Sequence, residues 1–164
     1  MLSDEEKARI EDEARRYPSR RAAISEALMI TQEARGWVTD EALADAAGAL
    51  GMSTASAESI ATFYELTWRR PVGKHVILVC DSVSCWMRGG DALMDHLRTL
   101  LGIELGGTTA DGLFTLLPAG CLGLCDIAPA LMVDGEAHGD LTTEKLDALI
   151  EGIRGGAHGD TAQR

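Results

Sequence analysis

Aromatic side chains make up only 4% of the 164 residues, so aliphatic side chains must fill most of the core. Positive charge is also scarce: 15 Lys and Arg stand against 26 Asp and Glu, and the net charge is −11. A nucleic-acid-binding protein needs a basic surface that displaces counterions from phosphates, so the composition argues against that class. An anionic membrane surface would repel the chain for the same reason.

The sequence has no apolar run long enough to cross a bilayer, because its longest uncharged stretch, residues 112–125, is short and contains proline and glycines. Residues 1–16 are highly charged and lack the apolar core of a secretory signal. We therefore expect a cytoplasmic protein, and any association with a membrane would come through partners. In a reducing compartment, the four cysteines favour metal or redox chemistry over disulfides.

Residues 1–70 are expected to form a small helical bundle, because each candidate helix start carries a Ser or Thr that can cap it. The candidate caps are Ser3, Ser19, Thr39 and Ser53. Ser3 and Glu6 have the spacing of a capping box. In the fourth helix we expect Tyr64 to face inward. The small side chains of these helices allow close packing.

The pattern changes at residues 69–73, a candidate linker, so residues 71–164 are expected to form a second domain. Its predicted element order is β-α-β-β-β-α, which makes the chain an α/β protein. The expected strands are 75–79, 113–117, 130–133 and about 137–139, and the expected helices are 91–101 and one capped by Thr142 or Thr143. Asp134-Gly135 predicts a hairpin turn, and the tail from Gly155 is expected to fray.

The cysteines form two close pairs, C-x4-C followed by C-x3-C: Cys80, Cys85, Cys121 and Cys125. Cys80 ends the first expected strand and Cys85 lies in the loop after it, whereas the second pair lies in the loop after the second strand. One helix connects these two strands, so they should be parallel. Both cysteine loops then leave the sheet at one edge, where α/β proteins commonly bind ligands.

Four thiolates at one sheet edge could hold iron or zinc. The loops favour a 2Fe–2S cluster, because Gly120 and Gly123 let backbone N–H groups approach the sulfurs. An apolar collar would limit water: Ala119, Leu122, Leu124, Ile127 and Ala128. A four-cysteine zinc site is an alternative, although such sites more often contain C-x2-C pairs, and disulfides or free core thiols are further alternatives.

The acidic composition predicts a low reduction potential for such a cluster. A 2Fe–2S cluster with four thiolates carries a charge of about −2, and reduction adds one more negative charge. Surrounding carboxylates oppose that addition, so a low-potential donor such as a flavin reduced by NADH would suit it. Trp86, next to Cys85, could shield the cluster from water.

Two segments around the cysteines resemble a known family: C-D-S-V-S-C-W-M-R-G-G from Cys80, and D-G-L-F-T-L-L-P-A-G-C-L-G-L-C-D-I-A-P-A-L-M-V-D-G from Asp111. Upstream, G-W-V-T-D-E-A-L from Gly36 and A-T-F-Y-E-L from Ala61 also match. They are similar to the small 2Fe–2S subunit (the E subunit, a thioredoxin-like ferredoxin) of bacterial NADH–quinone oxidoreductase, respiratory complex I. The resemblance covers roughly residues 5–154.

This resemblance implies a thioredoxin-like fold for the second domain and one 2Fe–2S cluster held by all four cysteines. It implies a flavoprotein partner that binds FMN and NADH, further peripheral-arm subunits, and a cluster that serves as an electron store or side acceptor. Gly120 stands where many relatives carry an acidic residue. The same kind of diaphorase subunit in an NAD-linked formate dehydrogenase or hydrogenase is therefore an alternative.

Two other functional classes compete with electron transfer. Residues 43–60 have the spacing of a DNA-binding helix-turn-helix, but the would-be recognition helix, 54–63, holds no Lys or Arg. A zinc-stabilised interaction domain is the alternative from a non-redox class. No Ser/His/Asp set or carboxylate pair suggests hydrolysis. We expect no catalytic residue on this chain, and oxidoreductase activity only as part of a complex.

Overall fold

The computed structural model describes residues 1–156. Two compact units divide the chain, Met1–Pro71 and the part from Val72 onward. The expected frayed tail falls largely on residues 157–164, outside the described residues. Among the helices of the described part, none has the length and apolar character needed to cross a bilayer.

The first unit consists of short helices, and its predicted caps are largely confirmed. The elements are α1 (Asp4–Arg15), the 3₁₀ helix η1 (Arg20–Ala23), α2 (Ile24–Arg35), α3 (Asp40–Ala49) and α4 (Thr54–Ala61). Ser3 and Glu6 form the complete capping box. The side chains of Thr39 and Ser53 accept hydrogen bonds from the N–H groups of the third residue after each of them, as N-caps do.

Two predictions for this unit are wrong. Ser19 caps no α-helix: its carbonyl accepts a hydrogen bond from the N–H of Ala22, and the chain winds first as η1, so α2 begins only at Ile24. Tyr64 does not face inward, because α4 already ends at Ala61 and Tyr64 lies 52% exposed in the segment that follows. The apolar spacing of this region extends past the residue where the helix stops.

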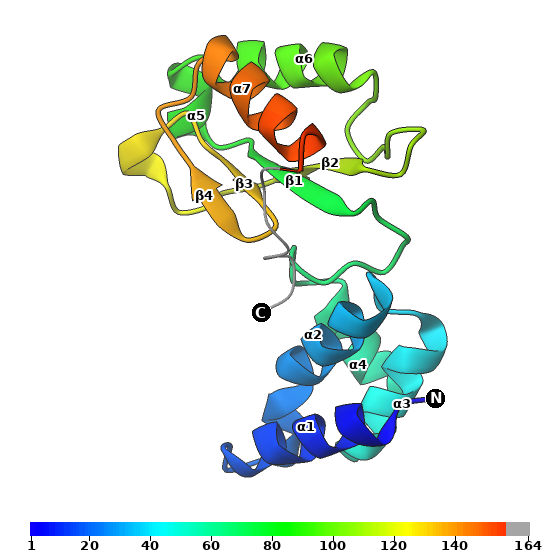
Figure 1. The fold of residues 1–164 in the computed structure, drawn as a ribbon. Coiled ribbons are helices and arrows are strands. Elements are labelled where there is room, and N and C mark those ends of the chain that lie inside the picture. The colour runs from blue at the N-terminus through cyan, green and yellow to red at the C-terminus, as the bar shows by residue number, and fades with distance from the viewer. Residues whose placement is uncertain (157–164) are drawn as a thin grey trace. The chain divides into compact units, whose positions relative to one another are not determined.

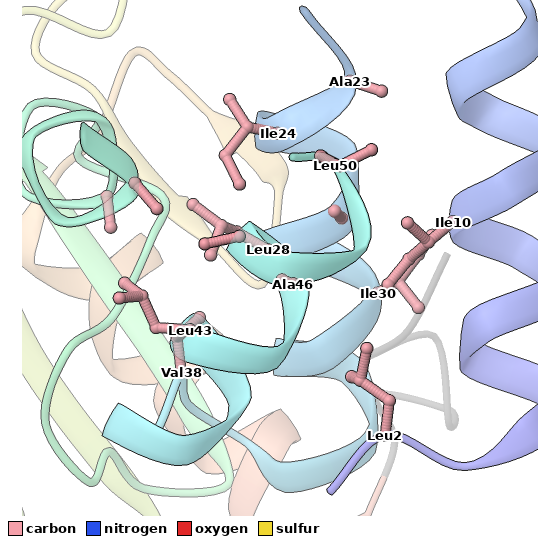
Figure 2. Close-up of a cluster of buried hydrophobic side chains, with 14 of the residues drawn as sticks. Leu2, Ile10, Ala23, Ile24, Leu28, Ile30, Val38, Leu43, Ala46 and Leu50 are labelled. Carbon is pink, nitrogen blue, oxygen red and sulfur yellow. The ribbon is translucent and has the colours of Figure 1, made fainter. Parts of the chain in front are cut away.

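The core of the first unit lies between its helices (Figure 2). It combines large aliphatic side chains such as Leu28 and Leu43 with completely buried alanines such as Ala27, Ala46 and Ala57. Because alanine has no atoms beyond Cβ, the helices that carry it can approach closely. This packing explains how a unit with few aromatic residues fills its interior.

A partly buried ion pair joins α1 to α2. The carboxylate of Glu6 accepts hydrogen bonds from the guanidinium of Arg35 and from the backbone N–H of Ser3. The hydrogen bond from Arg35 is the main cause that lowers the pKa of Glu6 from 4.5 to about 2. Burial works in the opposite direction, and hydrogen bonding with Ser3 lowers the pKa further.

The second unit is a four-stranded mixed sheet with helices (Figure 1). Its elements are β1 (His75–Cys80), α5 (Val83–Met87), α6 (Gly90–Leu101), β2 (Phe114–Ala119), η2 (Cys125–Ile127), β3 (Leu131–Val133), β4 (Glu136–His138) and α7 (Thr143–Arg154). The strand order is β2-β1-β3-β4. β1 pairs parallel with β2 and antiparallel with β3, and β3 pairs antiparallel with β4. The predicted β-α-β-β-β-α order is confirmed, with α5 as an additional short helix.

One face of the sheet is covered by α6 and α7 (Figure 1). Alternate strand residues such as Ile77 and Val79 meet Leu97 of α6 and Ile150 of α7 in one apolar cluster. Every residue of β1 is buried, as its continuous apolar run predicted. The side chain of Thr142 caps α7 by accepting a hydrogen bond from the N–H of Lys145.

The β3–β4 hairpin turn is the predicted Asp134-Gly135, and both residues have positive φ angles, 50° and 91°. The Asp134 carboxylate also reaches back to β1. It accepts a hydrogen bond from the N–H of Val76 at 2.9 Å and lies 2.6 Å from Nδ1 of His75. The turn therefore fixes the position of the hairpin against the first residues of β1.

The strand β2 lies at the edge of the sheet and extends two residues past the predicted end at Leu117. Residues 106–109 run along its outer side, where the N–H of Leu116 donates to the carbonyl of Gly107 and the N–H of Thr109 donates to the carbonyl of Phe114. The last part of the strand contains the exposed Pro118, which has no N–H to donate. Proline is tolerated here because edge strands can lack one donor.

Replacing Glu6 should destabilise the first unit in a pH-dependent way. We expect Glu6→Gln to lower the free energy of unfolding by about 2 kcal/mol at pH 7, because it removes a charged hydrogen-bond partner of Arg35. The folded-state pKa lies below the unfolded value, so this stabilisation is present above about pH 4.5 and disappears as the pH falls toward 2. Urea unfolding of the wild type and of Glu6→Gln at several pH values across this range measures the difference in the free energy of unfolding. Glu5→Gln, an exposed change in the same helical turn, is the control and should have little effect at any pH.

Candidate metal centre

The ends of β1 and β2 are level, which brings the two cysteine segments to one edge of the sheet. Cys80, the last residue of β1, lies opposite Ala119, the last residue of β2. The N–H of Asp81 continues the pairing with a 2.8 Å hydrogen bond to the carbonyl of Ala119. The predicted parallel pairing is thus confirmed. Figure 1 shows α5 and the yellow segment after β2 on the same side of the sheet.

The four cysteines, all within the described residues, are free thiols in two different environments. Cys80 and Cys85 are buried, with 4% and 2% of their surface exposed. Cys85 lies in α5, where the sequence predicted only a loop. Cys121 and Cys125 are exposed, and Cys125 begins the short 3₁₀ helix η2.

The structure brings Cys80 and Cys85 into direct contact, whereas the exposed pair stays apart from them. Cys80 and Cys85 share a small apolar cluster with Ala128 and Ala130. Within residues 1–156, no three side chains of His, Cys, Asp or Glu converge closely enough to hold a metal ion. Thiols must lose their protons to bind a metal, and binding then supplies the free energy that draws such ligands together.

A hydrogen bond from one cysteine segment to the other shows that the two are adjacent. The backbone N–H of Leu122, which lies between Cys121 and Cys125, donates to the sulfur of Cys80. Ser82 Oγ lies 3.3 Å from the same sulfur. Burial raises the pKa of the Cys80 thiol, but the hydrogen bonds from Ser82 and Leu122 outweigh it and leave the pKa below its ordinary value.

Cys85 behaves in the opposite way. Burial is the main cause that raises the pKa of the Cys85 thiol, and the neighbouring Cys80 raises it further. The backbone N–H of Ala130 donates to the Cys85 sulfur and opposes both effects. The sulfur of Cys80 therefore carries a negative charge more readily than the sulfur of Cys85.

The surroundings of Cys121 and Cys125 also suit thiolates that bind a metal centre. The N–H of Gly123 lies 3.4 Å from the sulfur of Cys121, and the positive φ of Gly123, 75°, shapes this turn. Backbone N–H groups that donate to sulfur are a common feature of iron–sulfur sites. Of the expected collar, Ala119 and Ala128 are buried, and the remaining members are half-buried: Leu122, Leu124 and Ile127. The donor set and its environment therefore fit a 2Fe–2S cluster. Trp86, which was expected to shield the cluster from water, is itself 59% exposed.

Three contacts that the sequence did not reveal hold the second cysteine segment. The guanidinium of Arg88, at the end of α5, donates a 2.9 Å hydrogen bond to the carbonyl of Ala128. The N–H of Asp140 donates to the carbonyl of Ile127 at 2.6 Å. Gly139 faces Ile127 so closely that an added Cβ would lie 2.4 Å from that side chain. These residues are distant in sequence from their partners, and no local pattern indicates such pairs.

A second close approach supports the first cysteine segment. An added Cβ at Gly90, the first residue of α6, would lie 2.8 Å from the carbonyl oxygen of Cys85. This contact lets α6 begin directly against α5. The backbone around Cys85 is therefore fixed by a glycine five residues later in the chain.

Adding a methyl group at either glycine should disturb the site. We expect Gly90→Ala and Gly139→Ala each to lower the free energy of unfolding by about 1–3 kcal/mol, because the new atom overlaps neighbouring atoms. Equilibrium unfolding in urea is the measurement. Gly152→Ala is the control: Gly152 lies inside α7 with nothing within 4 Å of an added Cβ, so this change should be neutral or stabilising by up to about 1 kcal/mol. Equal effects at all three positions would contradict the assignment of close contacts.

Comparison with known proteins agrees with this geometry. The chain is 47% identical over 151 residues to the E subunit of NADH-quinone oxidoreductase from Pseudomonas aeruginosa. The alignment covers 92% of this chain and 91% of the relative. It is 46% identical over 150 residues to the protein of the same name from Escherichia coli K12. This alignment covers 92% of this chain and 90% of the relative. These relatives confirm the resemblance noted in the sequence.

A solved structure has a similar fold. A chain of the NAD+-reducing nickel–iron hydrogenase in its H2-reduced state superposes with a TM-score of 0.70 and 29% identity. The match covers 85% of this chain but only 24% of that chain, so this protein corresponds to about a quarter of the hydrogenase chain.

The family itself is defined by its cofactor. Residues 10–154 match the family described as thioredoxin-like 2Fe–2S ferredoxin. The cofactor is accordingly a 2Fe–2S cluster, as the two cysteine segments predicted. With most of its length matched, and with two adjacent cysteine segments at one edge of an α/β sheet, this chain belongs to the thioredoxin-like 2Fe–2S ferredoxin family.

Proposed function

We propose that this chain transfers single electrons as a subunit of an NADH–quinone oxidoreductase, through a 2Fe–2S cluster on Cys80, Cys85, Cys121 and Cys125. Its partners in the complex are a flavoprotein subunit that binds FMN and NADH and further peripheral-arm subunits. Hydride removal from NADH is the chemistry of the partner's flavin, so no residue of this chain has a catalytic role. The observation that carries the ligand set is the parallel pairing that places Cys80, the last residue of β1, opposite Ala119, two residues before Cys121.

A bound 2Fe–2S cluster accepts and returns one electron. The chain's own residues adjust how readily this happens. N–H groups of Leu122 and Gly123 donate to cysteine sulfurs and stabilise their negative charge. The apolar collar limits the access of water, and the net charge of −11 opposes added negative charge. The N–H groups favour an added electron, whereas the apolar collar and the negative charge disfavour it. The last two effects support a low potential, within reach of a reduced flavin as the donor.

The division of the chain into a helical bundle, residues 1–70, and a thioredoxin-like cluster domain, residues 71–164, is part of this proposal. Two separate hydrophobic clusters, one among the helices and one between the sheet and its helices, support the division. A folded unit with its own core can act as an independent module. Association with a membrane, on its cytoplasmic side, would then come only through the other subunits.

A second candidate is the same role in a soluble NAD-linked hydrogenase or formate dehydrogenase, which the hydrogenase superposition favours. Isolation of the native complex separates the two candidates. A membrane arm that reduces quinone would support the first, and a nickel- or molybdenum-containing subunit would support the second.

Replacement of any one of the four cysteines should abolish stable cluster binding. In anaerobically purified protein we expect the visible absorbance and the EPR signal after dithionite to fall by about tenfold or more in Cys80→Ala, Cys85→Ala, Cys121→Ala and Cys125→Ala, because a missing thiolate leaves iron incompletely bound. Ser84→Ala, between the first two cysteines, is the control and should keep the cluster. A colourless wild-type protein that holds stoichiometric zinc would instead support a zinc-stabilised interaction domain.

The charge next to the cluster should set part of its potential. Asp126 is exposed and directly follows Cys125. We expect Asp126→Asn to raise the midpoint potential by a few tens of millivolts, because removing a nearby negative charge favours the added electron. Redox titration followed by EPR measures the shift. Glu136→Gln, on β4 toward the other end of the sheet, is the matched control and should shift the potential less.

A further inference from the structure

An apolar surface lies directly beside the buried cysteine pair. Val83, Trp86 and Met87 of α5 are 67%, 59% and 75% exposed. Their spacing of three and four residues places them on one face of the short helix, opposite the buried Cys85. Among the described residues from Val72 onward, Leu105 is the one other exposed large hydrophobic residue, so the apolar surface of this unit is concentrated on α5.

Exposed patches of this kind commonly mark protein–protein contacts. Trp and Met are enriched at the centres of interfaces, where Trp is a frequent hot-spot residue. We call the side chains of Val83, Trp86 and Met87 the α5 patch.

The backbone that carries the α5 patch is held in place. The N–H of Trp86 donates to the carbonyl of Ser82 at 2.9 Å, and the N–H of Gly89 donates to the carbonyl of Trp86 at 3.0 Å. Gly90 packs against the carbonyl of Cys85. A surface that is already ordered loses little conformational entropy on binding. The backbone of the α5 patch is thus already ordered before a partner binds.

The charges around the α5 patch indicate what kind of partner fits. Asp81, Asp126 and Asp140 are exposed on the segments that adjoin α5 and the cysteines. The nearby Arg88 donates to the carbonyl of Ala128 and lies 4.0 Å from Asp140, so its positive charge is already engaged. A second copy of this chain would place the same carboxylates against each other, and their repulsion disfavours such a dimer.

We propose that the α5 patch, with its acidic surroundings, is the surface on which the flavin-bearing partner docks, and that the partner presents an apolar pocket flanked by Lys or Arg side chains. This inference rests on the proposed function and assigns its contact surface. Docking on the face of α5 opposite Cys85 leaves only the width of this helix between the partner and one of the proposed cluster ligands. Acidic surroundings steer a basic surface toward this face, and the apolar residues then hold it.

The test uses the full chain with its cluster and the purified FMN-containing subunit from the same organism. We expect the double variant Trp86→Ser/Met87→Ser to weaken binding by about 30-fold or more, the size of effect typical of hot-spot residues. Asp126→Lys should lower the association rate by roughly tenfold at low salt, because it reverses a steering charge. Leu105→Ser and Glu136→Lys are the matched controls and should bind like the wild type.

Absorbance of the 2Fe–2S cluster is recorded for every variant, and only proteins that keep it are compared. Should the double variant lose the cluster, Val83→Ser, at an exposed position of the same face, replaces it, with an expected weakening of at least threefold. Binding of the cluster-bearing variants within twofold of the wild type overturns the assignment of the surface. A wild-type chain that holds its cluster yet does not bind the flavin-containing partner argues against the proposed function itself.

Discussion

The parallel pairing of β1 with β2 is the constraint on which the site depends. Since both strands end at the same level, the segments that follow them must leave the sheet side by side, and the two pairs of cysteines lie at or just beyond these ends. Pairing displaced by one or two residues would separate the sulfurs from the N–H groups that now contact them. The connection through α6 fixes this pairing, and the packing of α6 and α7 on one sheet face maintains it.

The two pairs of cysteines are ordered by their surroundings to different extents. Cys80 and Cys85 are packed in an apolar cluster, and backbone N–H groups from elsewhere in the chain reach both sulfurs. Cys121 and Cys125 lie on an exposed segment that is fastened through Arg88 and Gly139 rather than through its own secondary structure. The buried pair is therefore held by its packing, whereas the exposed pair is open to solvent.

Local chemistry and connectivity made much of this structure predictable from the sequence. The caps at Ser3, Thr39 and Ser53 follow from side chains that bond to nearby backbone, and the common edge of the cysteine segments follows from the handedness of β-α-β units. The short helix α5 was missed because five residues are too few to show a periodic pattern.

The supports of the site were not predictable, for a different physical reason. The contact of Arg88 with Ala128 joins residues 40 positions apart and exists only after the sheet has formed. The side of β2 that faces away from β1 has a separate consequence for the chain before it meets other subunits. Residues 106–109 occupy most of that side, and Pro118 offers no donor on the rest, so a foreign strand finds few partners there. Covering of this kind limits the pairing of another chain with the β2 edge.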